Sequence, residues 1–421
     1  MKLDPFKKIG KIYYKKPIPI ILGGFVNGLG LVRSFGQNKI PTILLDQKPS
    51  LAQYSKYTAG LLCPDPLNEE KKFIRFLLEL GKKLPNKGFL LATNDIWLVP
   101  ICKYRFELSE FYYFPMSEWD VIEKCWKKEY LYKISEENKI PIPKTFFINT
   151  ISELDTISDE IPFPCILKPS ITIGFMEKLQ SKGRTIVITS KIELMYWKNR
   201  IEMAGMTDIP LIIQEHISGP PSNLYTITSY ADKNSEIIAY SIGHKIRQYP
   251  PDAGTITSGE VEDVPEVYKW GCKLIKSLGF YGISNIEFKK DNRDGSYKLI
   301  EINPRPGMWN YSVLMSGVNL PYLAYQDLIG ESHGIIPVSS AGKKWIMLSD
   351  DLISAIYMNK KKGYPQFSLT FVEWIRSIKG ERIYAIESWQ DPLPGIFHWG
   401  KFILSLFRGF YKRDIITSDQ R

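Results

Sequence analysis

The chain has 421 residues, 44% of them hydrophobic and 24% charged, which suffices for two or three globular domains with sizeable cores. Its five scattered cysteines, with no CxxC pair, argue against a disulfide framework or a zinc site and fit a reducing cytoplasm. A formal net charge of +10 is compatible with nucleic acid, membrane surfaces or small anions as partners. The lysines are spread through the chain, so we interpret the charge mostly as that of a solvated surface. We therefore expect no nucleic-acid partner.

The first predicted elements form a β–α–β unit. Residues 18–22 are a short apolar strand, a glycine-rich turn follows over 23–30, residues 31–38 are a helix and residues 41–45 are the next strand. The dinucleotide fingerprint GxGxxG fails because Arg33 occupies its third glycine position, and no GxxxxGK[ST] motif occurs. We therefore expect a Rossmann-like domain that does not bind NAD.

A further strand of this domain ends in polar residues. A helix is predicted over 73–80 and a strand over 89–92, followed by Thr93, Asn94 and Asp95. In open α/β sheets ligands bind at the carboxyl ends of strands, which places these three residues near a substrate. The alternative is that Asn94 or Asp95 only caps the helix that follows.

The middle of the chain carries a lysine in an apolar strand. A helix over 126–138 ends at a proline-rich stretch, and the strand 163–170 holds Lys168 among apolar residues. A buried lysine is costly without a partner, so an anionic ligand is expected there. The following loop, 171–184, contains few glycines. Another apolar strand, 211–217, turns polar at its end.

A cationic segment precedes the acidic strands. Residues 224–230 and 236–241 read as antiparallel strands, and the segment 244–255 combines Lys245 and Arg247 with a proline-stiffened turn. We expect both cations to face anionic oxygens. The alternative is an edge strand with solvated charges.

Two alternating strands, 283–290 and 299–303, are joined by turn residues and predict a β-hairpin. If the hairpin is symmetric about Asp294, Glu287 lies opposite Glu301. Directly opposed like charges are destabilising, so a cation should separate them. A solvated acidic face is the alternative for an isolated glutamate pair.

Period-2 alternation places Leu299, Glu301 and Asn303 on one face of the second strand, and Arg305 follows in a rigid loop. Carboxylate and carboxamide oxygens are hard ligands that suit Mg²⁺. With Asn303 and Arg305 beside the two glutamates, the metal site is the favoured interpretation.

This pattern, a glutamate on one strand and Glu-x-Asn-x-Arg on the next, resembles the ATP-grasp superfamily, in particular its D-aspartate ligase-like, carboxylate–amine ligase branch. The resemblance covers about residues 18–330. It implies that ATP activates a carboxylate as an acyl phosphate, which an amine then attacks. The residues that it assigns are Lys128 (with Lys127 and Lys133 as alternatives) and Lys168 to phosphate; Gln214, Glu215, His216 and Ile217 to adenine; Glu287, Glu301 and Asn303 to Mg²⁺, with Mn²⁺ as an alternative; and Arg305, Arg247 and Lys245 to catalysis.

The resemblance also implies a domain plan. The fold class is α/β, with α+β character in the ATP-binding part. A Rossmann-like pre-ATP-grasp domain is expected over 1–125, a two-lobed ATP-grasp domain over 126–338 and a C-terminal extension over 339–421. A carboxylate–thiol ligase and a catalytically silent ATP-binding regulatory protein are the alternative functions. The expected partners are a small carboxylate and an amine in the cytoplasm, and a homodimer is left open.

The end of the chain is aromatic and basic. Residues 396–413 carry ten large apolar side chains together with Lys401, Arg408, Lys412 and Arg413. A basic amphipathic helix on a membrane surface is one interpretation. A helix docked on the protein core is commoner and is favoured here.

Overall fold

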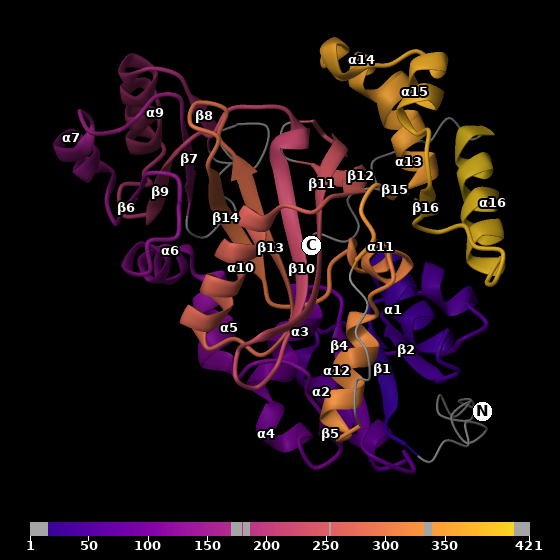
Figure 1. The fold of residues 1–421 in the computed structure, drawn as a ribbon. Coiled ribbons are helices and arrows are strands. Elements are labelled where there is room, and N and C mark those ends of the chain that lie inside the picture. The colour runs from indigo at the N-terminus through magenta and orange to yellow at the C-terminus, as the bar shows by residue number, and fades with distance from the viewer. Residues whose placement is uncertain (1–15, 170–178, 180–185, 252–253, 332–338, 408–421) are drawn as a thin grey trace.

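The computed structural model describes residues 16–169, 179, 186–251, 254–331 and 339–407 (Figure 1). Most of the glycine-poor loop 171–184, residues 252–253 of the segment 244–255, and the tail beyond 407 lie outside the described residues. The expected α/β class is confirmed: the described residues form three sheets with helices packed on them. None of their helices has the length and apolar character that crossing a membrane requires.

A five-stranded parallel sheet forms the N-terminal domain, as expected for a Rossmann-like unit. Its strand order is β3-β2-β1-β4-β5, so the connections reverse direction between β1 and β4. The carboxyl ends of these two strands border the crevice where such sheets bind ligands. The elements are β1 (Ile18–Leu22), α1 (Val26–Gly36), β2 (Thr42–Asp46), β3 (Thr58–Leu62), α2 (Glu70–Gly81), β4 (Gly88–Ala92), α3 (Asp95–Lys103), α4 (Arg105–Leu108), β5 (Tyr112–Tyr113) and α5 (Trp119–Trp126).

The glycine-rich segment 23–30 is largely helix rather than turn, which corrects the expectation. Because α1 begins at Val26 instead of residue 31, Gly28 and Gly30 lie inside it. A Cβ at Gly28 would lie 2.1 Å from the carbonyl oxygen of Gly23, and one at Gly30 would lie 3.0 Å from the Tyr311 side chain. These glycines therefore permit close packing of the helix, a role that the sequence pattern does not distinguish from a turn.

A seven-stranded sheet, in the order β14-β13-β10-β11-β12-β15-β16, forms the body of the molecule. Its last two strands come from the segment after 338, so the C-terminal extension completes this sheet. The elements are β10 (Leu224–Ala231), β11 (Ile237–Tyr249), β12 (Thr255–Val261), α10 (Pro265–Leu278), β13 (Gly282–Lys290), β14 (Tyr297–Asn303), α11 (Asn310–Met315), α12 (Leu320–Leu328), β15 (Lys344–Ile346) and β16 (Arg382–Tyr384).

A smaller lobe, at the upper left of Figure 1, has a four-stranded sheet in the order β6-β9-β7-β8 and its own hydrophobic core. The expected second lobe is therefore present. Its elements are β6 (Thr145–Ile148), α7 (Leu154–Ile157), β7 (Cys165–Pro169), β8 (Ile186–Ile188), α9 (Lys191–Met203) and β9 (Leu211–Glu215). The preceding helix α6 (Lys128–Glu137) packs on α5 and α10 and contributes to the main core.

The C-terminal extension is fastened to the N-terminal domain. Arg33 of α1 donates from Nε to Asp391 Oδ2 at 3.1 Å, and both side chains are only 2% exposed. Phe397 stacks on Tyr54 with ring centroids 3.7 Å apart. The helix expected at 396–413 is thus docked on the body, as far as the described residues reach. The helices are α13 (Leu348–Ile353), α14 (Asn359–Lys361), α15 (Phe371–Ser377) and α16 (Leu393–Phe407).

Candidate functional site

The two acidic strands form the expected hairpin. β13 and β14 are antiparallel, Glu287 pairs directly with Glu301, and Asn285 pairs with Asn303. All four side chains line the same cavity, so the hairpin presents two carboxylates and two carboxamides on one face. Asn285 Nδ2 donates to the carbonyl oxygen of Arg305 at 2.6 Å, which fixes the loop that follows β14.

A β-bulge at Ile300 corrects the expected face of Leu299. Phe288 pairs with Leu299 but Glu287 pairs with Glu301, so one residue of β14 is left over. An extra residue shifts the side-chain alternation by one. Leu299 is therefore fully buried in the core instead of sharing the face of Glu301.

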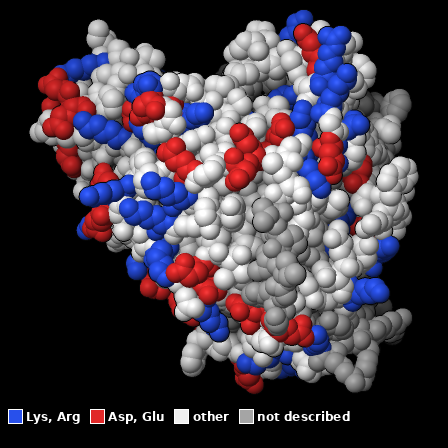
Figure 2. All heavy atoms as spheres, in the orientation of Figure 1, with Lys and Arg blue, Asp and Glu red and all other residues white. Residues whose placement is uncertain are grey.

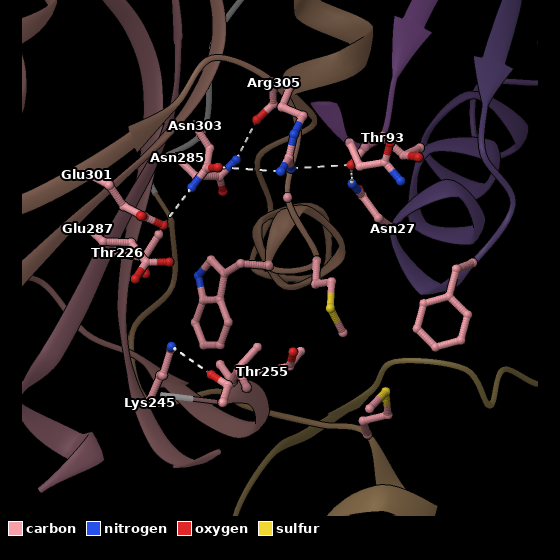
Figure 3. A pocket seen from close by; sticks show the side chains of 18 residues that line it. Asn27, Thr93, Thr226, Lys245, Thr255, Asn285, Glu287, Glu301, Asn303 and Arg305 are labelled. Carbon is pink, nitrogen blue, oxygen red and sulfur yellow. Dashed lines mark hydrogen bonds between the residues drawn. The ribbon is translucent and has the colours of Figure 1, made fainter. Parts of the chain in front are cut away.

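The hairpin forms one wall of a cavity of about 190 Å³, and the N-terminal domain forms the opposite wall (Figure 3). Arg305 reaches across: its Nε donates to Asp95 Oδ1 at 2.7 Å and its Nη1 donates to the Thr93 carbonyl oxygen at 3.3 Å. The lining also includes Thr226, Lys245, Thr255, Met308 and Trp309.

Residues 93–95 include a helix cap, and two of them also line the cavity. Asn94 accepts a hydrogen bond from Trp97 N at 3.4 Å and so caps α3, yet Thr93 and Asn94 also line the cavity. Asp95 holds the guanidinium of Arg305. A capping residue at the carboxyl end of a strand thus serves the fold and the site together.

Asn27 joins the two walls, and sequence reasoning missed it. Its Nδ2 donates to the carbonyl oxygens of Thr93 at 2.7 Å and Pro306 at 2.8 Å, which uses both amide hydrogens. Its Oδ1 is buried and has no partner among the described residues. That oxygen is left to accept a hydrogen bond from a ligand or water. The signal available in the sequence was its place just after a strand end.

Glu287 and Glu301 lie in unlike electrostatic environments. Burial raises the pKa of Glu287 above its usual range, and Glu301 raises it further although Lys245 opposes the rise. Burial would also raise the pKa of Glu301, but Lys128 and a hydrogen bond from Asn303 hold it below its usual value. A cation between the two carboxylates would relieve their repulsion.

The donor set fits a hard divalent cation. Two carboxylates and an amide oxygen suit Mg²⁺, which takes its other ligands from phosphate and water. The Glu301 side chain keeps 42% of its surface exposed, so the pair remains open to such ligands. Among the described residues, no cluster of three or more His, Cys, Asp or Glu side chains forms an all-protein metal cage.

Of the three lysines that the sequence left open, the structure brings Lys128 to the acidic pair. Its Nζ donates at 2.9 Å to the carbonyl oxygen of the bulge residue Ile300 and lies 3.7 Å from Glu301 Oε2. Lys127 forms an exposed ion pair elsewhere, and Lys133 is exposed. The bulge therefore supplies the acceptor that holds Lys128 in place.

Lys168 lies in β7, and its Nζ donates to Gln214 Oε1 at 3.4 Å. Burial and the nearby charge of Lys128, partly offset by Glu301, lower the pKa of Lys168 to about 7. A neutral or poorly neutralised lysine beside a second lysine is a position prepared for an anion.

Gln214 orients this lysine. Its Nε2 donates to Tyr132 Oη and Thr145 Oγ1, both at 2.9 Å, so its amide is occupied on both sides. The contact of the Gln214 side chain with adenine that the resemblance implies stays a prediction, and in this structure both ends of the amide already have partners.

The remainder of segment 214–217 is also engaged. The Glu215 carboxylate forms ion pairs with Arg293 and with Lys298, the latter at 3.2 Å. The backbone N–H groups of Glu215 and His216 already donate to carbonyl oxygens of neighbouring strand ends, at 2.8 and 2.9 Å. The adenine contact expected there stays a prediction, and these two N–H groups are not free for it.

Lys245 and Arg247 do not share a face, which corrects the prediction that both face the site. Register shifts in the β11–β12 pairing follow Lys245 and again Arg247. Lys245 lines the cavity, whereas Arg247 forms a bidentate pair with Asp351, at 2.9 and 2.6 Å. Asp351 is fully buried in the C-terminal extension. Arg247 therefore fastens that extension to the central sheet.

A second cavity, of about 640 Å³, adjoins the first. It lies at the carboxyl ends of the N-terminal strands and shares Phe25 and Asn94 with the lining of the smaller cavity. Phe397, His398 and other residues of α16 form part of its wall. The sequence did not indicate a functional role for the C-terminal extension. The structure shows that the extension forms part of the wall of this second cavity.

The part of the chain that contains this site is similar to a known protein family. The model of a family described as "ATP-grasp in the biosynthetic pathway with Ter operon" matches residues 222–343, which include the whole acidic hairpin. Over these residues the chain is similar to the ATP-grasp family, so the resemblance stated from the sequence is confirmed.

The chain is similar to several ligases. A D-aspartate ligase of Enterococcus faecium (strain Aus0004) is 27% identical over 326 residues, 74% of this chain and 76% of the relative. The arginine-specific large chain of carbamoyl phosphate synthase of Geobacillus stearothermophilus is 25% identical over 224 residues, which cover 51% of this chain but only 20% of that protein.

Solved structures share the fold. An L-amino acid ligase from Bacillus licheniformis superposes with a TM-score of 0.58 at 16% identity, covering 77% of this chain and 78% of that one. An N5-carboxyaminoimidazole synthetase from Staphylococcus aureus, complexed with ADP, gives 0.59 at 15% identity, covering 84% and 88%. These similarities support the ATP-grasp architecture over most of the chain.

Proposed function

We propose that this chain is an ATP- and Mg²⁺-dependent ligase that activates a carboxylate as an acyl phosphate and joins it to an amine of the amino-acid type. The observation that carries the proposal is the direct pairing of Glu287 with Glu301 at a cavity edged by Lys128, Lys245 and Arg305. The paired carboxylates suit the metal ion of a metal–triphosphate complex, and the cations around them suit its phosphate oxygens. A cytoplasmic location, where ATP is present, belongs to the same proposal.

The residues of the chain have distinct roles in this reaction. Lys128 and Lys168 bind phosphate oxygens, and Gln214 positions Lys168. Glu287, Glu301 and Asn303 hold Mg²⁺, which supplies neutralisation of charge on the transferring phosphoryl group. Lys245 binds anionic oxygens in the cavity. Arg305, fixed by Asp95, orients the substrate carboxylate or the γ-phosphate.

The two chemical steps balance without a protein nucleophile. A substrate carboxylate oxygen attacks the γ-phosphorus and the bond to the ADP oxygen breaks. The amine nitrogen then attacks the acyl carbon, inorganic phosphate leaves, and the nitrogen loses a proton. Burial raises the pKa of all five cysteine thiols, which disfavours a covalent thioester enzyme.

The first test concerns Lys168, whose pKa should rise when phosphate binds. Because the pKa of the free lysine is about 7, nucleotide affinity should be greatest below pH 7 and fall as the pH rises above 7, by up to about tenfold per unit for one proton. Titration calorimetry at pH 8 in two buffers of different ionisation enthalpy should detect proton uptake on Mg–ATP binding.

Lys168→Met should weaken ATP binding, abolish this proton uptake and leave the protein folded. The matched control is Lys127→Met, which removes an exposed lysine and should change neither quantity. Unchanged ATP affinity in Lys168→Met would remove this lysine from the phosphate site.

The ligase proposal itself is tested with ATP, Mg²⁺ and a panel of amino acids offered as carboxylates and amines. Phosphate release should require both a carboxylate and an amine, and mass spectrometry should identify the amide product. Phosphate release with thiols but not with amines would favour the thiol ligase. Tight ATP binding with no turnover for any pair would favour the silent regulator.

A further inference from the structure

The C-terminal helix α16 is fixed to the protein by one face only. Phe397 stacks on Tyr54, and Phe402 is 4% exposed. The buried ring of His398 forms a hydrogen bond of 2.7 Å between Nε2 and Ser349 Oγ. These contacts set the rotation of the helix about its axis, so its opposite face is held outward.

That outward face is also apolar. Leu393, Ile396, Ile403 and Leu404 are 55%, 64%, 47% and 56% exposed. Their spacings of three, seven and eight residues place them on one side of a helix. Trp389, just before the helix, is fully exposed. A helix that is apolar on two opposite faces buries only one of them against the protein. Its other face is left for a second environment.

A neighbouring helix repeats the arrangement. In α15, Phe371, Val372 and Ile375 are exposed, while Trp374 of the same helix points inward and donates to the buried Asp351 at 2.8 Å. Figure 1 shows α14 and α15 at the top of the C-terminal extension and α16 along its right side. The exposed apolar residues thus stand on separate helices of the extension.

The charge of this region is strongly positive. Residues 339–421 contain thirteen Lys and Arg against eight Asp and Glu, which is half of the net charge of the whole chain. Three of those acids, Asp350, Asp351 and Asp391, are buried. The helix α16 contains Lys401 and no acidic residue. Figure 2 shows basic side chains gathered over α14.

We propose that α15 and the outer face of α16 dock this protein on an anionic lipid surface. Exposed aliphatic residues with a tryptophan beside them and cations around them match a helix lying in the membrane interface, with its apolar side in the acyl boundary. The cations add attraction to anionic headgroups. A second copy of the chain fits less well, because a self-complementary contact would oppose like charges.

This inference complements the docked-helix interpretation of the tail. The inner face of α16 binds the body and forms part of the second cavity, and the outer face binds lipid. The lipid-facing helix therefore lies directly over the larger chamber of the site. The proposal does not depend on the ligase chemistry, since membrane binding is measured without substrates.

The test uses the full chain and sedimentation with vesicles. Vesicles of phosphatidylcholine containing phosphatidylglycerol should bind the wild type, and pure phosphatidylcholine should bind it far less. The double variant Ile396→Glu/Ile403→Glu should lower the partition coefficient by about tenfold or more, because it places acids in the lipid-facing side. Raising the salt concentration should weaken wild-type binding.

The matched control is Ile192→Glu, which adds an acid at an 85% exposed isoleucine on α9 in the smaller lobe. It should bind vesicles as the wild type does, and equal melting temperatures should show that all variants are folded. No binding of wild type to anionic vesicles, or equal loss in both variants, would overturn the proposal. A wild-type dimer that Ile396→Glu/Ile403→Glu dissociates, without vesicle binding, would assign the face to self-association instead.

Discussion

Glu301→Gln should reduce ATP turnover by about 10²-fold or more, on the scale of removing one electrostatic stabiliser of a transition state. The carboxylate faces Glu287 across the hairpin, and replacing it removes a metal ligand together with half of a like-charge pair. Folding stability without metal should therefore change by no more than about 1 kcal/mol. Turnover assays and thermal melts with and without Mg–ATP measure both effects.

The control for this variant is Glu236→Gln, which neutralises an exposed acid paired with Lys276 and should leave turnover unchanged. Mg–ATP should raise the melting temperature of the wild type and of this control, but much less that of Glu301→Gln. Retained turnover in Glu301→Gln would show that the acidic pair is structural.

Arg247→Met should destabilise the folded protein by about 3–5 kcal/mol, because it leaves the carboxylate of Asp351 buried without its cation. Thr257 Oγ1 and Trp374 Nε1 would still donate to that carboxylate but carry no charge. The measurement is denaturant unfolding, in which the midpoint should fall while the turnover of the folded fraction is retained.

Arg305→Met is the matched comparison, since Arg305 is the arginine that reaches across the smaller cavity. It should lose most turnover with a smaller change in stability, because Asp95, its partner, is 43% exposed. If Arg247→Met remained stable but inactive, Arg247 would have the catalytic role that the resemblance implies.

The hairpin could be predicted because its signals are local. Turn residues between two alternating strands fix the pairing, and Glu287 does lie opposite Glu301. The bulge at Ile300 could not be predicted, since one extra residue leaves no compositional mark. It nevertheless buries Leu299 and gives Lys128 its acceptor.

The errors in the sequence interpretation come from distant partners. Arg247 stands two residues from Lys245, which suggested a shared face, but the register shifts and Asp351, far along the chain, decide its position. β15 and β16 are three residues each, too short for a periodic pattern, and form through pairing with the sheet. Asn27 donates hydrogen bonds to backbone carbonyl oxygens, and a motif of side-chain types does not indicate such contacts.

The central claim, that the acidic hairpin binds a metal–nucleotide complex, is tested most directly with Mn²⁺ as a spectroscopic substitute for Mg²⁺. Electron paramagnetic resonance measures free Mn²⁺ during titration of the protein with a non-hydrolysable ATP analogue present. Wild type should bind Mn²⁺ more tightly than the analogue alone does, and a folded Glu287→Gln/Glu301→Gln variant should lose that added affinity. Equal Mn²⁺ binding by the two folded proteins would contradict the metal site and the ligase mechanism built on it.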